Sequence, residues 1–126
     1  MFLLDTNTII YYLKGGFSSN GMKMIGGVVD NQPSISIITK IELLGFNAPN
    51  AKEQEFTKKF VKACYIFNLN ETVIDQTIVL RKQYKIKIPD AVIAATAMVY
   101  SLTLITHNTG DFNKIANLKC TDPHSL

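Results

Sequence analysis

Short apolar runs alternate along the chain with segments in which apolar residues recur at helical spacing. The runs predict strands, which span residues 2–4, 34–38, 65–69, 102–106 and 118–121. Helical spacing and helix-breaking residues predict a first helix that Gly15 and Gly16 end, a helix that Pro89 opens, and others at residues 21–30, 40–46, 51–63, 71–85 and 111–116. Because parallel strands are joined by helical crossovers, this alternation favours a parallel sheet with helices on both faces, an α/β/α sandwich.

The bulk properties of the chain fit one globular domain. The 126 residues are 47% hydrophobic and 18% charged, and they contain no repeat, low-complexity tract or linker, so we expect a single domain over residues 1–126. Cys64 and Cys120 lack the spacing of a metal site, and we expect both to be reduced. The most apolar stretch falls short of the ~20 residues that a membrane span needs, and no export signal is visible. The sequence therefore predicts a cytoplasmic protein without membrane association.

Acidic residues fall at the junctions between the predicted strands and helices. Asp5 directly follows the first strand, Glu42 comes soon after the second, and Asp111 follows the fourth. Asp90 stands next to Pro89 at the start of a helix. In open parallel sheets, ligands bind at the carboxyl ends of the strands, so we expect these carboxylates to meet at one edge of the sheet.

Each of these acids also fits a helix-capping role. Asp5 could cap the first helix, and Thr39 with Glu42 has the spacing of a capping box. Asp90 could simply complement a helix dipole, and Asn108 to Asp111 could be another cap with an acidic residue at its third helical position. Only 10 acids exist in the chain, however, and four of them fall at one predicted edge. Their joint placement favours a shared site over four separate caps.

Four carboxylates in one pocket repel one another unless a cation is present. Mg²⁺ and Mn²⁺ prefer such oxygen ligands, and the chain offers no Cys/His set for zinc. With the four acids set aside, 13 basic residues face 6 acidic ones, a balance of +7 that suits a polyanionic substrate. Together these features predict metal-assisted hydrolysis of phosphodiesters.

Four segments carry a resemblance to a known family. They are residues 3–7 (LLDTN), 38–45 (ITKIELLG), 89–97 (PDAVIAATA) and 104–112 (LITHNTGDF). In this order and spacing they resemble the acidic motifs of PIN-domain nucleases, and specifically of VapC toxins from bacterial and archaeal toxin–antitoxin pairs. The resemblance covers essentially the whole chain.

The resemblance implies a fold, an activity and partners. The fold would be a PIN-domain-like three-layer α/β/α sandwich with a parallel sheet of four or five strands. The activity would be Mg²⁺- or Mn²⁺-dependent cleavage of structured RNA, a tRNA or an rRNA loop, with one or two metal ions. The partners would be a cognate antitoxin and a second copy in a homodimer. The metal would be held by Asp5, Glu42, Asp90 and Asp111, with support from Thr6, Thr106 and Asn108.

Two other functions compete with this interpretation. A phosphatase of the haloacid-dehalogenase type would use Asp5 as nucleophile, but it needs a second Asp where this chain has Asn7. A non-catalytic PIN scaffold that binds RNA or protein would keep the fold, yet four clustered carboxylates would then only cost stability.

Some polar residues have no assigned role at this point. His107 fits a solvated loop better than a phosphate contact, and His124 has no expected chemistry. Two cation clusters fit solvated faces and RNA-backbone contacts about equally well. They comprise Lys52, Lys58, Lys59 and Lys62, and Arg81, Lys82, Lys85 and Lys87.

Overall fold

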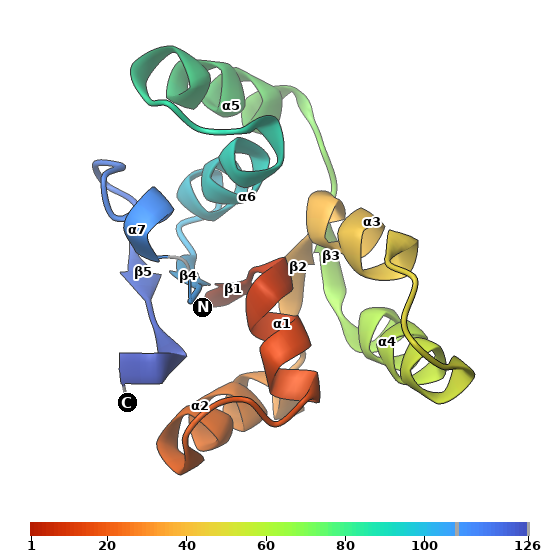
Figure 1. Ribbon diagram of the computed structural model, residues 1–126. Helices are drawn as coiled ribbons and strands as arrows, with labels where there is room; N and C mark the ends of the chain where they lie inside the picture. Colours follow the sequence, from red (N-terminus) through yellow and green to blue (C-terminus); the bar gives the residue numbers. More distant parts are fainter. Residues whose placement is uncertain (108, 126) are drawn as a thin grey trace.

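Among the residues that the structure describes, five short parallel strands form the middle layer. The structure is a computed structural model that describes residues 1–107 and 109–125. The strands are β1 (Phe2–Leu4), β2 (Ser34–Ser36), β3 (Tyr65–Phe67), β4 (Thr103–Ile105) and β5 (Cys120–Thr121). Parallel ladders join β1 to β4 and β4 to β5, and a separate parallel ladder joins β2 to β3. Since β1 also lies beside β2, the strands run in the order β3-β2-β1-β4-β5 (Figure 1).

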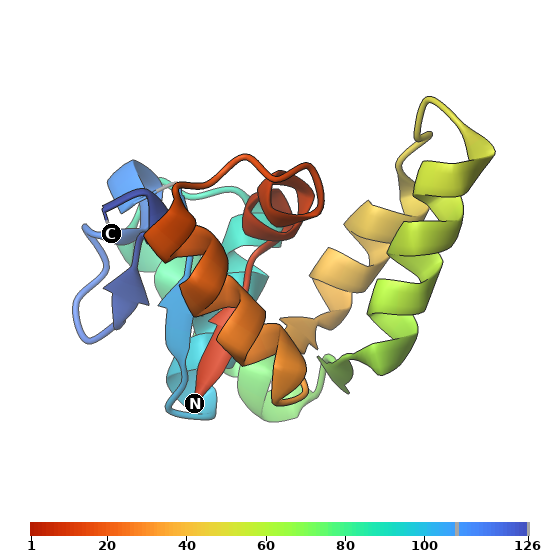
Figure 2. The same ribbon diagram turned by 90° about the horizontal axis from the view of Figure 1, so that it is seen from below.

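Helices surround this sheet on both faces. They are α1 (Thr6–Leu13), α2 (Ser19–Asp30), α3 (Ile37–Gly45), α4 (Ala51–Ala63), α5 (Glu71–Gln83), α6 (Ile88–Val99) and α7 (Thr109–Phe112), followed by the 3₁₀ turn η1 (Pro123–Ser125). In Figure 1, α5 and α6 lie on one side of the strands, and α1 and α2 lie on the other. Figure 2 shows α3 and α4 side by side, extending away from the other helices, and we call this pair the α3–α4 arm. Within the described chain, no helix has the length and apolar character to cross a membrane.

The alternation of side chains along the strands divides the core into two clusters. Leu3 and Leu104 are fully buried in a cluster with the apolar side chains of α6. Their neighbours Leu4 and Ile105 are fully buried in a second cluster, with side chains from α1 and α2. Successive residues of a strand point to opposite faces, so the two clusters lie on the two faces of the sheet. The predicted α/β/α sandwich with a parallel sheet is confirmed.

The boundary between the second strand and the following helix differs from the prediction. The strand expected to reach residue 38 ends at Ser36, and α3 begins at Ile37 rather than at residue 40. The Ser36 hydroxyl accepts a hydrogen bond from the amide of Ile38 and so caps the helix one turn earlier. Thr39 is therefore a buried residue inside α3, and the capping box proposed for Thr39 and Glu42 is wrong.

Other helix boundaries agree with the prediction to different degrees. The helix expected at 51–63 is α4, with the same limits, and the helix expected at 71–85 ends at Gln83. The helical turn expected at 111–116 is wrong, because α7 begins at Thr109 and ends at Phe112. Cys64 and Cys120 are both free, as predicted.

Candidate functional site

Asp5 lies at the carboxyl end of β1, where its amide and both carboxylate oxygens are hydrogen-bonded. Its amide donates to the carbonyl of Ile105 (3.2 Å), and its side chain is only 4% exposed. One carboxylate oxygen, Oδ1, accepts from the amide of Thr8 (2.8 Å), which makes Asp5 the N-cap of α1. The other, Oδ2, accepts from the hydroxyl of Thr106. The predicted capping role of Asp5 is therefore correct, but it uses only one of the two oxygens.

Glu42 is brought to the same edge by α3. It is exposed in the second turn of that helix, and its Oε1 accepts a hydrogen bond from the hydroxyl of Thr6 (2.6 Å). The Thr6 hydroxyl also hydrogen-bonds to that of the buried Thr39 (3.1 Å). Thr6 directly follows Asp5, so these bonds fix the position of Glu42 relative to the end of β1.

The helices α6 and α7 carry the remaining two acids, Asp90 and Asp111. Asp90 is partly buried in the first turn of α6, and Asp111 is exposed in the first turn of α7. Burial raises the pKa of Asp90, and the negative charges of Asp111, Glu42 and Asp5 raise this pKa further, in that order. Lys87 opposes the shift in the pKa of Asp90. The charges of the other three predicted acids therefore all act on Asp90.

The ionised form of Asp5 is disfavoured as well. Burial raises its pKa above 3.8, hydrogen bonds from Thr106 and Thr8 lower it, and the charge of Glu42 raises it again. Negative charges held together in this way are relieved by a cation. Carboxylate and hydroxyl oxygens are the donors that Mg²⁺ and Mn²⁺ prefer, so the donor set fits those ions. Across residues 1–107 and 109–125, however, no three His, Cys, Asp or Glu side chains are already arranged to hold a metal.

Two of the three residues predicted to support the site, Thr6 and Thr106, lie within the described chain. Thr6 and Thr106 contact Glu42 and Asp5 as described above. Asn108 lies outside the described residues. The expectation of a simple solvated loop for His107 is incomplete: its side chain is 44% exposed, but its ring lies 4.0 Å from that of His124 and 5.5 Å from that of Tyr11, measured between centroids.

Sequence reasoning missed this aromatic contact. The ring of His124 also packs on Phe17, with centroids 4.6 Å apart, and thereby joins η1 to the start of α2. The residues come from distant parts of the chain, and each looks unremarkable in its own segment. No local pattern could have predicted their meeting.

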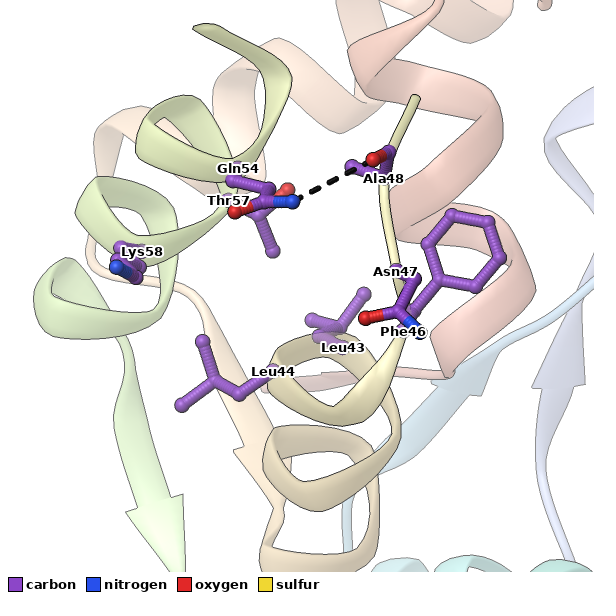
Figure 3. Close-up of a pocket in the computed structure, with 8 residues that line it drawn as sticks. All are labelled: Leu43, Leu44, Phe46, Asn47, Ala48, Gln54, Thr57 and Lys58. Carbon is purple, nitrogen blue, oxygen red and sulfur yellow. Dashed lines mark hydrogen bonds between the residues drawn. The ribbon is translucent and has the colours of Figure 1, made fainter. Parts of the chain in front are cut away.

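The largest apolar hollow near the arm is separate from the acids. A groove of about 320 Å³ runs between α1 and the α3–α4 arm. We call it the apolar groove, and its lining includes Ile10, Leu13, Met22, Leu43, Phe46 and Phe56. A smaller hollow of about 100 Å³ lies at the tip of the arm, where Gln54 donates to the carbonyl of Ala48 (3.4 Å; Figure 3). Leu13, Phe46 and Phe56 are 37%, 56% and 59% exposed, so the groove presents apolar surface to solvent.

Comparison with known proteins agrees with this architecture. Residues 2–118 match the family model of the PIN domain. A toxin–antitoxin complex from Klebsiella pneumoniae contains a chain 31% identical to this one, with 98% of each chain covered and a TM-score of 0.75. FitAcB from Neisseria gonorrhoeae matches at 26% identity over 100% of each chain, with a TM-score of 0.82. VapBC-1 from nontypeable Haemophilus influenzae matches at 27% identity over 97% of each chain, with a TM-score of 0.78. No match was found among curated protein sequences.

The chain belongs to the PIN domain family. Within that family its resemblance is to the VapC type of toxin, since these solved structures are of VapBC, FitAB and other toxin–antitoxin complexes. PIN domains are typically nucleases, so membership supports a nuclease activity.

Proposed function

We propose that the protein is an endoribonuclease that depends on Mg²⁺ or Mn²⁺ and acts as the toxin of a toxin–antitoxin pair. One observation carries the catalytic part of the proposal. The charges of Asp5, Glu42 and Asp111 all act on Asp90, although the four acids follow different strands and helices. Four carboxylates at the carboxyl edge of a sheet would gain from a cation there, which supports the proposal.

In this proposal the four acids have different roles. Asp5 and Asp90 would bind the cation directly, because they are the more buried of the acids and both have a raised pKa. Glu42 would bind it or accept a proton from the attacking water, and the Thr6 hydroxyl would orient its carboxylate. Asp111 would act through water molecules. A bound divalent cation would supply Lewis-acid activation of water and would neutralise charge on the scissile phosphate.

The test is cleavage of total RNA by the purified protein with Mg²⁺, with Mn²⁺ and with a chelator. We expect discrete fragments that require metal and that disappear in Asp5→Asn. Asparagine keeps an oxygen for the amide of Thr8, so the variant should stay folded. A matched control is Asp75→Asn, which changes an exposed acid of α5. Near-normal cleavage by Asp5→Asn would falsify the site assignment.

The partner part of the proposal concerns the apolar groove. The matched solved structures are complexes of toxin with antitoxin. We propose that a cognate antitoxin binds this chain, and that an apolar segment of it covers Leu13, Phe46 and Phe56, which are exposed without it. Co-expression of the two genes followed by affinity purification tests this. Phe46→Asp should reduce recovery of the antitoxin while leaving metal-dependent cleavage intact.

The second candidate is a PIN scaffold that binds RNA without cutting it. It is favoured by the absence, among the described residues, of a ready-made group of three metal ligands. RNA binding without metal-dependent cleavage by antitoxin-free protein would support this candidate. The resemblance also implies a homodimer, which sedimentation of the purified protein would test.

A further inference from the structure

One of the two cation clusters differs from the other in its surroundings. Residues 81–87 read RKQYKIK, with four cations and no acid. The cluster on α4 is interspersed with Glu53 and Glu55, and Lys58 approaches Glu55 to 3.6 Å. The α4 cluster is therefore a mixed, self-compensating surface, whereas residues 81–87 form a block of one sign.

Three hydrogen bonds hold this block in place, and only one of its four charged side chains, Arg81, takes part in them. The Arg81 guanidinium donates to the carbonyl of Ile86 (2.6 Å) and closes the turn between α5 and α6. The Tyr84 hydroxyl accepts from the amide of Ala116 (3.0 Å). The Lys114 ammonium donates to the carbonyl of Lys85 (3.0 Å) and adds a further cation from the segment after α7. Two basic segments distant in sequence are thus tied together.

The tied segments lie beside the acidic site. Lys87 is the N-cap of α6, whose first turn carries Asp90. Lys114 comes shortly after Asp111 in the chain. Three exposed cations therefore stand at the end of α5 and in the turn that leads into α6. We call them the basic ridge, and they are Lys82, Lys85 and Lys87.

We propose that the basic ridge binds the phosphates of the RNA strand next to the bond that the acidic site cleaves. The proposal rests on the proposed function for its substrate. Like charges held side by side repel each other, and a polyanion relieves that repulsion while it releases counterions. Because the ridge is fixed to the segments that carry Asp90 and Asp111, a strand bound along it is positioned relative to the site. Arg81 is not part of the ridge, since its guanidinium serves the backbone.

The test compares two variants of equal charge. Lys82→Gln, Lys85→Gln and Lys87→Gln together remove three ridge cations, and Lys114 is retained because it holds the carbonyl of Lys85. The control combines Lys52→Gln, Lys59→Gln and Lys62→Gln on α4, all exposed as well. Binding of a fluorescein-labelled uridine oligonucleotide is measured by anisotropy in chelator, over a series of salt concentrations. Circular dichroism establishes that both variants are folded.

The ridge variant should lose affinity and salt dependence together. Each phosphate contact on a single strand contributes about 0.7 to the slope of log K against log salt, so three lost contacts should lower the slope by about 2. The Kd should rise by at least about tenfold at low salt, while the α4 control changes far less. Equal losses in the two variants, or wild-type protein that does not bind the oligonucleotide, would overturn the proposal.

The binding measurement is independent of catalysis. Ridge-dependent binding without metal-dependent cleavage would keep the ridge and refute the nuclease. Cleavage with unchanged KM in the ridge variant would keep the nuclease and refute the ridge. If both hold, the ridge variant should show a raised KM with little change in kcat, because the ridge positions substrate and touches no reacting atom.

Discussion

At the scale of single residues, Asp5 caps a helix and, in the proposed function, would also bind the cation. Its Oδ1 caps α1 through Thr8, and its Oδ2 receives the hydroxyl of Thr106. Replacement by alanine would remove the cap and the charge together, and loss of an N-cap alone costs about 1 kcal/mol. Asparagine separates the two effects because it keeps the cap and removes the charge.

Thr106 should influence activity without contacting metal or substrate. Its buried hydroxyl orients Oδ2 of Asp5, and loss of such a supporting contact typically lowers metal affinity or activity by about 10–100-fold. We expect Thr106→Val, which keeps the shape of the side chain, to raise the Mg²⁺ concentration needed for half-maximal cleavage within that range. An unchanged metal requirement would mean that the hydroxyl does not position Asp5.

The stability of metal-free protein should depend on Asp90 in a direction set by its pKa. The folded-state pKa lies above 3.8, so the folded protein binds protons at a pH where the unfolded chain does not. Ionised Asp90 therefore destabilises the folded protein at neutral pH. This destabilisation decreases as the pH falls through the raised pKa toward 3.8. The N-terminus of α6 favours the charge of Asp90, but burial and three neighbouring carboxylates outweigh that effect.

We therefore expect Asp90→Asn to unfold at a higher temperature than wild type in chelator at neutral pH. The difference should shrink as the pH falls toward 4. Mg²⁺ should raise the Tm of wild type more than that of the variant, since only wild type keeps the full set of ligands. Thermal melts over a pH series, with and without Mg²⁺, check these three expectations. A variant that is less stable than wild type in chelator at neutral pH would contradict the predicted direction of the effect.

At the scale of elements, the start of α3 decides where Glu42 lies. Ser36 ends β2, caps α3 and is fully buried, so one residue sets both boundaries. Ser36→Ala should lower the free energy of unfolding by about 1 kcal/mol, within the usual range for an N-cap. It should also weaken metal binding, because Glu42 lies on that helix. Urea unfolding measures the first effect, and Ser18→Ala, which removes the cap of α2, is a control for the second.

Some elements could be predicted from sequence because local signals agree with the packing. Asn50 caps α4 and the apolar residues of that helix recur at helical spacing, so its limits match the prediction. The segment 34–38 is different, because β-branched residues stand on both sides of Ser36, in β2 and in α3. Burial on both sides of Ser36 favours the earlier helix start, and burial depends on distant residues. Local propensity could not decide that boundary.

The candidate site could likewise be predicted only in part from the sequence. Motif spacing predicts a site of Asp5, Glu42, Asp90 and Asp111, and in the structure the charges of the other three act on Asp90. The hydrogen bond from Thr6 to Glu42 could not be predicted, because it depends on how α1 and α3 meet. The two cation clusters differ in sequence, since only the α4 cluster contains acids, but the contacts of residues 84–85 with the segment after α7 could not be predicted.

At the scale of the whole molecule, the helices differ in how much of the fold depends on them. Seven consecutive residues of α6 are buried, from Ala91 to Ala97, whereas Phe56 of α4 is 59% exposed. Segments with few buried contacts open more easily than the core. Amide hydrogen exchange in α4 should therefore be faster than in α6, where it should approach the rate of global unfolding. Equal protection of the two helices would show that the α3–α4 arm is as firmly packed as the core.

The pairing of β1 with β4 has a consequence for the order of events during synthesis. Asp5 and Thr106 are 101 positions apart, and β1 hydrogen-bonds to β4 from Phe2↔Thr103 to Leu4↔Ile105. At 5–20 residues per second, a ribosome takes roughly 5 to 20 s to travel that distance. Until then the first strand lacks this hydrogen-bonding partner, and the carboxylates of Asp5 and Asp111 cannot act together. In the proposed function, a growing chain therefore cannot yet cleave RNA, and a product that lacks β4 and the residues after it is inactive.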